Sequence, residues 1–174
     1  MISHTQVQCF VLLAALVLSG PARAQQDVPE ALRSFAPSLT DLPSAPLGEA
    51  GRTYVPAYSS VMAGGGRTRV NFAVTLSVHN TSESDPLVVT RIDYYETSGR
   101  LTQAYLKAPV AIRPYGTVQV VVAQEDTTGG LGANFVVDWQ TRSAATEPAI
   151  EAVMIANVGG QSFSFLSNGR RVGR

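Results

Sequence analysis

QEDTTGGLGANFVVDWQ, the sequence of residues 124–140, joins a glycine-rich acidic loop to a short apolar segment. In its second half, Phe135, Val137 and Trp139 stand at every other position, and Asp138 lies between the last two. This alternation is typical of a strand with one face in a core, because successive side chains of a strand point to opposite faces. We expect Trp139, the only tryptophan, to fill that core.

The same alternation, with an apolar residue at every other position, recurs on both sides of this stretch. Its clearest example is Val70 to Asn80, where an apolar residue occupies each even position from 70 to 78. The predicted strands are 52–58, 70–80, 87–95, 101–106, 117–123, 135–140, 151–157 and 162–167, with turn residues between them. This pattern predicts an all-β fold, an antiparallel β-sandwich of the immunoglobulin-like kind with about eight strands. The domain, residues 51–169, is long enough for one core.

The first residues predict export. An apolar run from Cys9 to Leu18 precedes Ala22-Arg23-Ala24, an A-x-A pattern that is typical of a signal peptide cut after Ala24. The run is shorter than the roughly 20 residues that a membrane-spanning helix needs, so the mature chain has no integral membrane segment. Cleavage also removes Cys9, the only cysteine. Export without disulfides favours a bacterial periplasm, and we expect a periplasmic or secreted protein.

The segments on either side of the domain look unstructured. Residues 25–50 carry four prolines and few large apolar residues, and we interpret them as a proline-rich linker or disordered arm. Residues 170–174 contain three arginines, and we interpret them as a solvated basic tail. The whole chain is formally neutral, and loss of Arg23 leaves −1 on the mature chain. A nucleic-acid binder needs a strong positive excess, so this class is set aside.

Several motifs together resemble a known family. They include YVPAYS at 54–59, IDYY at 92–95 and EDTTGGLGANFVVDW at 125–139, with shorter segments at 74–81, 99–101 and 150–155. These segments are similar to those of a family of uncharacterised secreted bacterial proteins, labelled a domain of unknown function. The resemblance covers nearly the whole domain and none of the proline-rich arm. It implies export and one compact domain, and it brings no catalytic assignment.

The acidic glycine-rich loop is the main candidate for a binding site. Its candidate ligand-binding residues are Glu125, Asp126, Gly129, Gly130, Gly132 and Asn134. Its glycines allow backbone N–H groups to converge on an anion, but the adjacent acids would repel one. The two acids and Asn134 could instead bind a hard cation such as Ca²⁺ through oxygen atoms. The structural alternative is a tight connection in which Asp126 or Asn134 caps a turn.

Catalytic motifs are missing from the sequence. His79 is the only histidine after the predicted cleavage site, and no G-x-S-x-G or H-E-x-x-H pattern occurs. We therefore expect neither an enzyme nor a bound cofactor. Adjacent Tyr94 and Tyr95 must point to opposite faces of a strand, so one belongs to the core. Tyr95 is a further candidate for contact with a sugar or peptide.

These observations favour an exported non-catalytic module that binds a protein or another envelope component, or serves a structural role. Binding would use the 125–134 loop or an edge strand at Tyr54 to Tyr58, because Pro56 cannot complete a central ladder. The first alternative is a cation- or glycan-binding accessory domain that uses the Glu125–Asn134 loop. The second is a hydrolase that uses the loop carboxylates.

Overall fold

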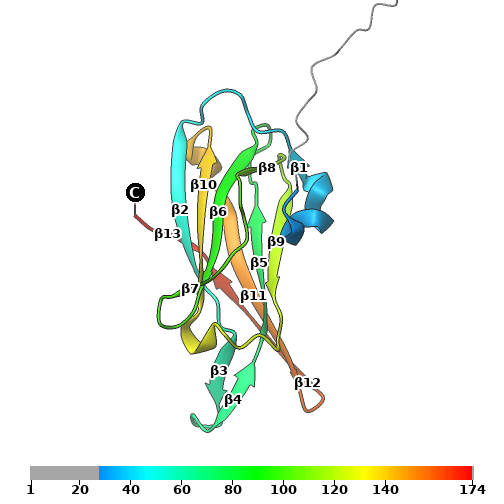
Figure 1. Cartoon of the computed structure of the whole chain (residues 1–174), viewed down its shortest axis with the longest axis vertical. Helices are drawn as coiled ribbons and strands as arrows, with labels where there is room; N and C mark the ends of the chain where they lie inside the picture. Colours follow the sequence, from blue (N-terminus) through cyan, green and yellow to red (C-terminus); the bar gives the residue numbers. More distant parts are fainter. Residues whose placement is uncertain (1–27, 174) are drawn as a thin grey trace, which may run out of the picture.

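The protein is a sandwich of two antiparallel sheets. The computed structural model describes residues 28–173, so the predicted signal peptide lies outside the described residues. The molecule is long and narrow, with the two sheets packed face to face along its length (Figure 1). The prediction of an all-β antiparallel sandwich is confirmed. No helix among residues 28–173 is long and apolar enough to cross a membrane.

One sheet has the order β1-β8-β6-β10-β2-β13, with β7 also paired to β6, and the other has the order β12-β11-β5-β9. A separate hairpin joins β3 and β4. The strands are β1 (Leu39–Thr40), β2 (Glu49–Pro56), β3 (Ser60–Ala63), β4 (Thr68–Asn71), β5 (Ala73–His79), β6 (Leu87–Tyr95), β7 (Leu101–Ala104), β8 (Val110–Ile112), β9 (Thr117–Val122), β10 (Asn134–Thr141), β11 (Ala149–Val158), β12 (Gln161–Asn168) and β13 (Arg170–Arg171). Residues 28–173 also contain three 3-10 helices: η1 (Glu30–Ser38), η2 (Gly130–Gly132) and η3 (Ala144–Thr146).

The core lies between the sheets and follows the predicted alternation. On β10, Phe135, Val137 and Trp139 are buried, and the Trp139 ring nitrogen donates to Thr53 Oγ1 at 2.9 Å. The Trp139 ring lies against Gly51, where a Cβ would stand 2.2 Å from a ring carbon. The central strand β10 therefore depends on a glycine at its neighbour β2, because a side chain there would displace the tryptophan.

The long strand predicted at 70–80 is divided in the structure. Val74, Leu76 and Val78 are buried as predicted, but the strand breaks at Phe72. The part before the break, β4, pairs with β3 in the hairpin at the lower end of the molecule (Figure 1). The turn after the strand begins with Asn80, which is buried. Its side-chain Nδ2 group donates to the carbonyls of Asp85, Ile112 and Arg113.

The interpretation of residues 25–50 as a disordered arm was wrong for the part that the structure describes. Helix η1 packs against the sandwich and buries Leu32 completely, while β1 pairs with β8. The composition of this segment is poor in apolar residues, but Leu32 and Phe35 face a core that is already formed by the sheets. A few well-placed contacts therefore order the segment without a core of its own.

The two predictions about the edge of β2 also need correction. Arg170 and Arg171 do not form a solvated tail; they form β13, which pairs with Tyr54 and Thr53 of β2. The Val172 amide then donates to the Arg52 carbonyl at 2.9 Å. β13 therefore covers the edge of β2 at Thr53 and Tyr54, the start of the predicted edge segment, and Pro56 stands at the last position of β2, where it pairs with Asn134 of β10.

Candidate functional site

The glycines of the 124–133 loop are used for packing within the chain. A Cβ at Gly129 would lie 1.9 Å from the Tyr94 hydroxyl oxygen. Thr97 Oγ1 donates to the Gly129 carbonyl at 2.9 Å and accepts from the Gly132 amide at 2.8 Å. Gly130 has φ +74, and its carbonyl accepts from Ser59 Oγ at 3.1 Å. The loop is thus fastened to the end of the sandwich, and the Gly132 amide is directed at Thr97.

The acidic residues of this loop are not arranged as a cluster of metal ligands. Asp126 Oδ1 accepts from the backbone amide of Thr128 at 3.0 Å and from its hydroxyl at 2.5 Å, so this carboxylate caps its own turn. Glu125 is exposed, and Asn134 opens β10 opposite Pro56 and Tyr95. No three His, Cys, Asp or Glu side chains gather within residues 28–173 as a metal site would require. Calcium binding stays a prediction, and an unchanged melting temperature in millimolar Ca²⁺ would count against it.

Tyr94 and Tyr95 point to opposite faces, as predicted. Tyr94 is buried under the loop, while the half-buried Tyr95 donates through its hydroxyl to Asp93 Oδ2 at 3.3 Å. Asp93 belongs to a row of ion pairs on the outer face of the sheet. In this row Arg91 Nε lies 3.0 Å from Asp138 Oδ2, and Arg52 Nε lies 2.6 Å from Asp138 Oδ1. The hydroxyl of Tyr95 therefore takes part in a polar network, and contact of its ring with a sugar or peptide stays a prediction.

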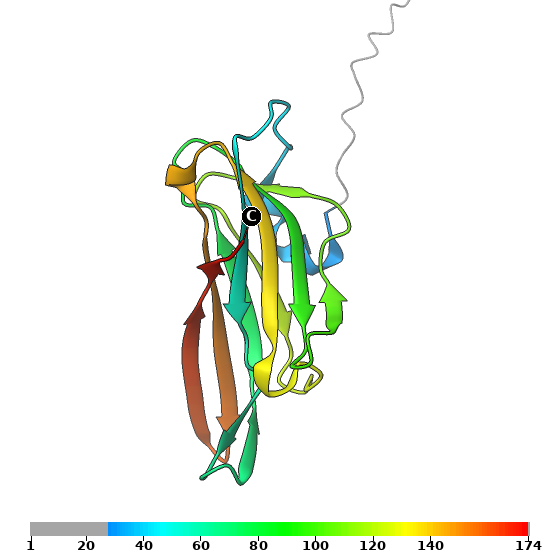
Figure 2. The same ribbon diagram turned by 90° about the vertical axis from the view of Figure 1, so that its left-hand side faces the viewer.

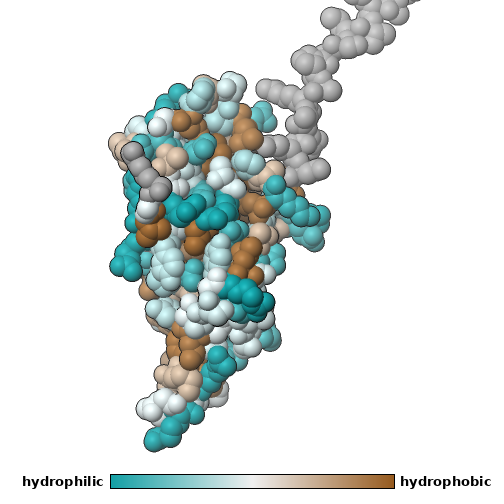
Figure 3. Space-filling view, turned by 60° about the vertical axis from the view of Figure 1, so that its left-hand side comes forward, coloured by the Kyte–Doolittle hydropathy of each residue, from teal (hydrophilic) through white to brown (hydrophobic). Residues whose placement is uncertain are grey.

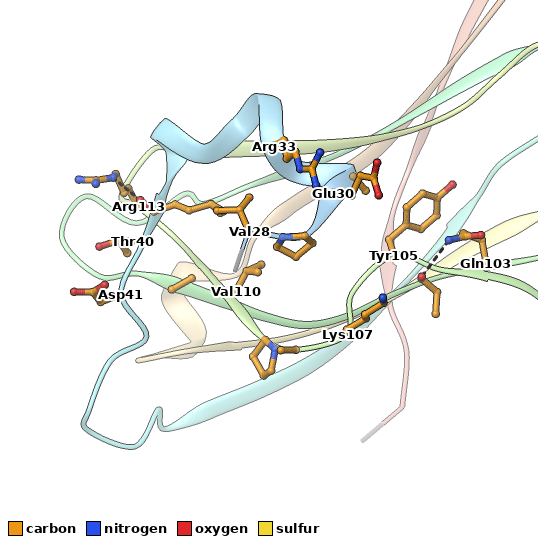
Figure 4. A pocket seen from close by; sticks show the side chains of 17 residues that line it. Val28, Glu30, Arg33, Thr40, Asp41, Gln103, Tyr105, Lys107, Val110 and Arg113 are labelled. Carbon is orange, nitrogen blue, oxygen red and sulfur yellow. Dashed lines mark hydrogen bonds between the residues drawn. The ribbon is translucent and has the colours of Figure 1, made fainter. Parts of the chain in front are cut away.

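A large cavity is lined in part by residues of the segment that was predicted to be a disordered arm. It has a volume of about 1320 Å³ and lies between η1, β1 and the segment that joins β7 to β8 (Figure 4). Its lining mixes the apolar side chains of Val28, Leu39, Tyr105 and Val110 with the charged ones of Glu30, Arg33, Asp41, Lys107 and Arg113. Because acidic and basic groups are mixed, the lining does not select a ligand of one charge.

A second cavity of about 550 Å³ contains two carboxylates, those of Glu49 and Asp138. Glu49 Oε1 lies 2.6 Å from Arg171 Nη2, and Asp138 is held by two arginines. Neither cavity is lined by Glu125 or Asp126. These arrangements give the hydrolase alternative no support.

The outer edge of β12 is the least protected surface of the sandwich. In Figure 2, β12 lies at the left-hand margin, and no strand of residues 28–173 lies on its outer side, in agreement with its terminal place in the sheet. Its eight residues, QSFSFLSN, contain no charge and no proline. Phe163 and Leu166 keep 45% and 51% of their surface exposed. Native proteins usually protect edge strands with charges, prolines or a covering element.

The alternation of hydrogen-bonded and non-hydrogen-bonded residue pairs shows which backbone groups of β12 do not bond to β11. Gly159 and Gly160, with φ +57 and +81, form the two-residue hairpin loop between Val158 and Gln161. In such a hairpin the flanking residues form a hydrogen-bonded pair, so odd-numbered residues of β12 bond to β11. The odd-numbered Gly169 continues this pattern, because its backbone amide donates to the Ile150 carbonyl at 2.8 Å. The even-numbered residues, Ser162, Ser164, Leu166 and Asn168, therefore direct their N–H and C=O groups outward.

Apolar side chains extend from this edge across the outer face of the sheet. Val121, Thr75, Val153 and Leu166 form one row across four strands, because each is the direct cross-strand partner of the next. Val121 is 58% exposed and Ile155, beside this row, is 45% exposed. On the side of the molecule drawn in Figure 3, hydrophobic patches reach the surface among polar ones, including one just above the narrow lower end. The β12 edge and this row form one continuous surface.

The model of a family described as "Protein of unknown function (DUF3124)" matches residues 50–172. The chain belongs to this family. The resemblance to a domain of unknown function is thereby confirmed. The DUF3124 match includes every strand from β2 to β13 and leaves out η1 and β1, which supply one side of the larger cavity. The β12 edge lies inside the DUF3124 match, and the family's description names no activity.

Other comparisons give the DUF3124 chain no assigned activity. No curated protein matches it. One solved structure, "Crystal Structure of Thermotoga maritima 1070", is 10% identical, with 71% of this chain and 96% of that chain covered, at a TM-score of 0.41. A likeness of this degree carries no conclusion about the function of the chain.

Proposed function

We propose that this DUF3124 protein is an exported, non-catalytic module that binds a protein partner by adding an extended segment to the outer edge of β12. The observation that carries the proposal is the free row of N–H and C=O groups at Ser162, Ser164, Leu166 and Asn168. In strand addition, such backbone groups supply affinity, and side-chain contacts on the two faces supply specificity.

The other edges of the two sheets are shorter or covered, which singles out β12. The larger sheet ends in β1 and β13, each of two residues, and in β7, which pairs only with β6 and has four residues. At the far side of the smaller sheet, η1 packs against β9 (Figure 1). β12 has eight residues and no such protection among the described elements. An incoming strand would contact Phe163 and Phe165 on one face and Leu166 on the other.

The predicted signal peptide supports the exported location. A partner's extended segment with alternating apolar residues fits the surface best, because β12 offers apolar side chains at 163, 165 and 166 and no charge to pair.

The test uses two substitutions of one residue that differ in backbone chemistry. Ser164→Pro removes an outward N–H and places a ring on the edge, whereas Ser164→Ala keeps the N–H. Capture of partners from periplasmic extract should fall at least about tenfold for Ser164→Pro, since hydrogen bonds are lost and close approach is blocked. Ser164→Ala should capture as the unchanged protein does. Equal capture by all three proteins, with unchanged circular dichroism, would contradict the proposal.

A further inference from the structure

We infer that the partner of the β12 edge is a second copy of this chain, paired antiparallel across a twofold axis at Phe165. The inference rests on the proposed strand addition and specifies its partner. It joins two sheets of four strands, each ordered β12-β11-β5-β9, into one continuous sheet.

The position of the axis follows from the free backbone groups. A twofold axis between antiparallel edge strands is perpendicular to the sheet and relates one residue to its own copy. The outward-facing residues are Ser162, Ser164, Leu166 and Asn168, and their midpoint is Phe165. With the axis there, Ser164 pairs with Leu166 of the copy and Ser162 with Asn168 of the copy. Every outward N–H and C=O of the strand then has a partner, which no other register achieves.

The side chains of β12 are compatible with their own copy on both faces. On the inner face, Phe165 meets Phe165 of the copy, next to the aromatic contact in which Phe165 and Phe72 have ring centroids 5.2 Å apart. On the outer face, Leu166 meets Ser164 of the copy and extends the row through Val153. No residue of β12 is charged, so the two copies meet without like-charge repulsion.

Symmetry explains why a second copy fits better than an open series of partners. A twofold contact uses the same edge on both molecules and closes at two copies. The far edge of each four-stranded sheet is β9, against which η1 packs, so the joined sheet ends there. Self-pairing at β12 therefore protects the unguarded edge and yields a finite dimer rather than a fibre.

The first experiment measures mass in solution by sedimentation over a range of protein concentrations. A contact of two edge strands is smaller than a standard interface, so we expect a dissociation constant on the order of micromolar. Ser164→Pro should raise this constant at least about tenfold by loss of edge hydrogen bonds, and Ser164→Ala should leave it unchanged. Leu166→Lys is a second disrupting variant that keeps the backbone intact, should the proline variant fail to fold.

The second experiment tests the register by disulfide formation in a chain that carries Cys9→Ser. A mixture of Ser164→Cys and Leu166→Cys chains should cross-link, because the two positions oppose each other across the interface. Either variant alone should remain largely uncross-linked. Rapid cross-linking of Ser164→Cys alone would overturn the axis at Phe165.

The outcomes separate this inference from the proposed function. A chain that is monomeric at all concentrations, yet captures another protein through a contact sensitive to Ser164→Pro, overturns the second-copy inference and leaves strand addition standing. A dimer insensitive to both Ser164→Pro and Leu166→Lys overturns the inference by placing the interface elsewhere. If Ser164→Pro changes neither mass nor capture, both proposals fail.

Discussion

At the residue scale, the loop glycines show what a sequence pattern can and cannot specify. The pattern GGLG correctly marked a place where the backbone needs freedom, and Gly130 has φ +74. It did not reveal the neighbours, because Tyr94 and Thr97 come from another strand and another turn. Asp126 was predicted either to bind a cation or to cap a turn, and its contacts with Thr128 match the second alternative.

Gly129→Ala should destabilise the protein by roughly 1–3 kcal/mol, the range for a group forced into a filled space. The added Cβ would meet the Tyr94 hydroxyl oxygen at 1.9 Å. Gly132→Ala is the matched control, because its nearest contact is 3.3 Å from Thr97 Cγ2. Urea unfolding of both variants measures the difference in the free energy of unfolding. A Gly129→Ala protein as stable as the Gly132→Ala protein would show that the loop is not packed on Tyr94.

Tyr105 should make stability fall in alkaline solution. Burial, with smaller effects of Tyr94 and Asp126, raises the pKa of Tyr105 from 10.0 to about 12. The unfolded chain thus loses this proton near pH 10 while the folded chain keeps it, so stability is full below pH 10 and declines as pH rises toward 12. Part of the ring is in water, and we expect a decline of about 1–2 kcal/mol. Urea unfolding at several pH values should show a smaller decline for Tyr105→Phe, and equal declines would refute the assignment.

At the scale of elements, each of the eight predicted strands has a counterpart in the structure, although the one at 70–80 is divided between β4 and β5. These strands were predictable because a two-residue period is a local property of the sequence. Thr90 shows where such a pattern shifts phase. Val89 is buried opposite Trp139, but Ile92 is buried opposite Val137, and the extra residue between them forms a bulge in β6. The immunoglobulin-like description rested on strand number and stays a prediction. Helix η1 escaped prediction because its order depends on contacts with distant strands.

Leu32→Ala tests whether η1 is an integral part of the fold. Leu32 is fully buried in the common core, so its truncation should cost about 2–5 kcal/mol. The adjacent Arg33 is exposed, and Arg33→Ala should change stability by less than about 0.5 kcal/mol. Chemical unfolding of the two variants compares them directly. Similar small losses would mean that η1 adds no stability to the sandwich.

At the scale of the whole molecule, the last residues connect the two sheets. After β12, the chain leaves one sheet at Gly169 and enters the other as β13. Arg171 then lies 5.2 Å from the centroid of the Trp139 ring and pairs with Glu49 and Glu147. A five-residue basic end has no period from which pairing could be predicted. The same limit applies to β2, whose edge looked free only because its partner lies more than a hundred residues later in the chain.

Removal of residues 170–174 should therefore weaken the whole sandwich and create a new edge. The truncation deletes the pairing of β13 with β2 and the bond from the Val172 amide to the Arg52 carbonyl. Loss of these backbone hydrogen bonds alone should cost roughly 1–3 kcal/mol. Removal of residues 173–174 only is the control, because the bond at Val172 remains. A lower melting temperature is expected for the longer truncation alone. Because Thr53 and Tyr54 would then present free backbone groups, sedimentation should also show association that Ser164→Pro does not abolish. Identical melting temperatures for the two truncations would mean that β13 does not hold the β2 edge.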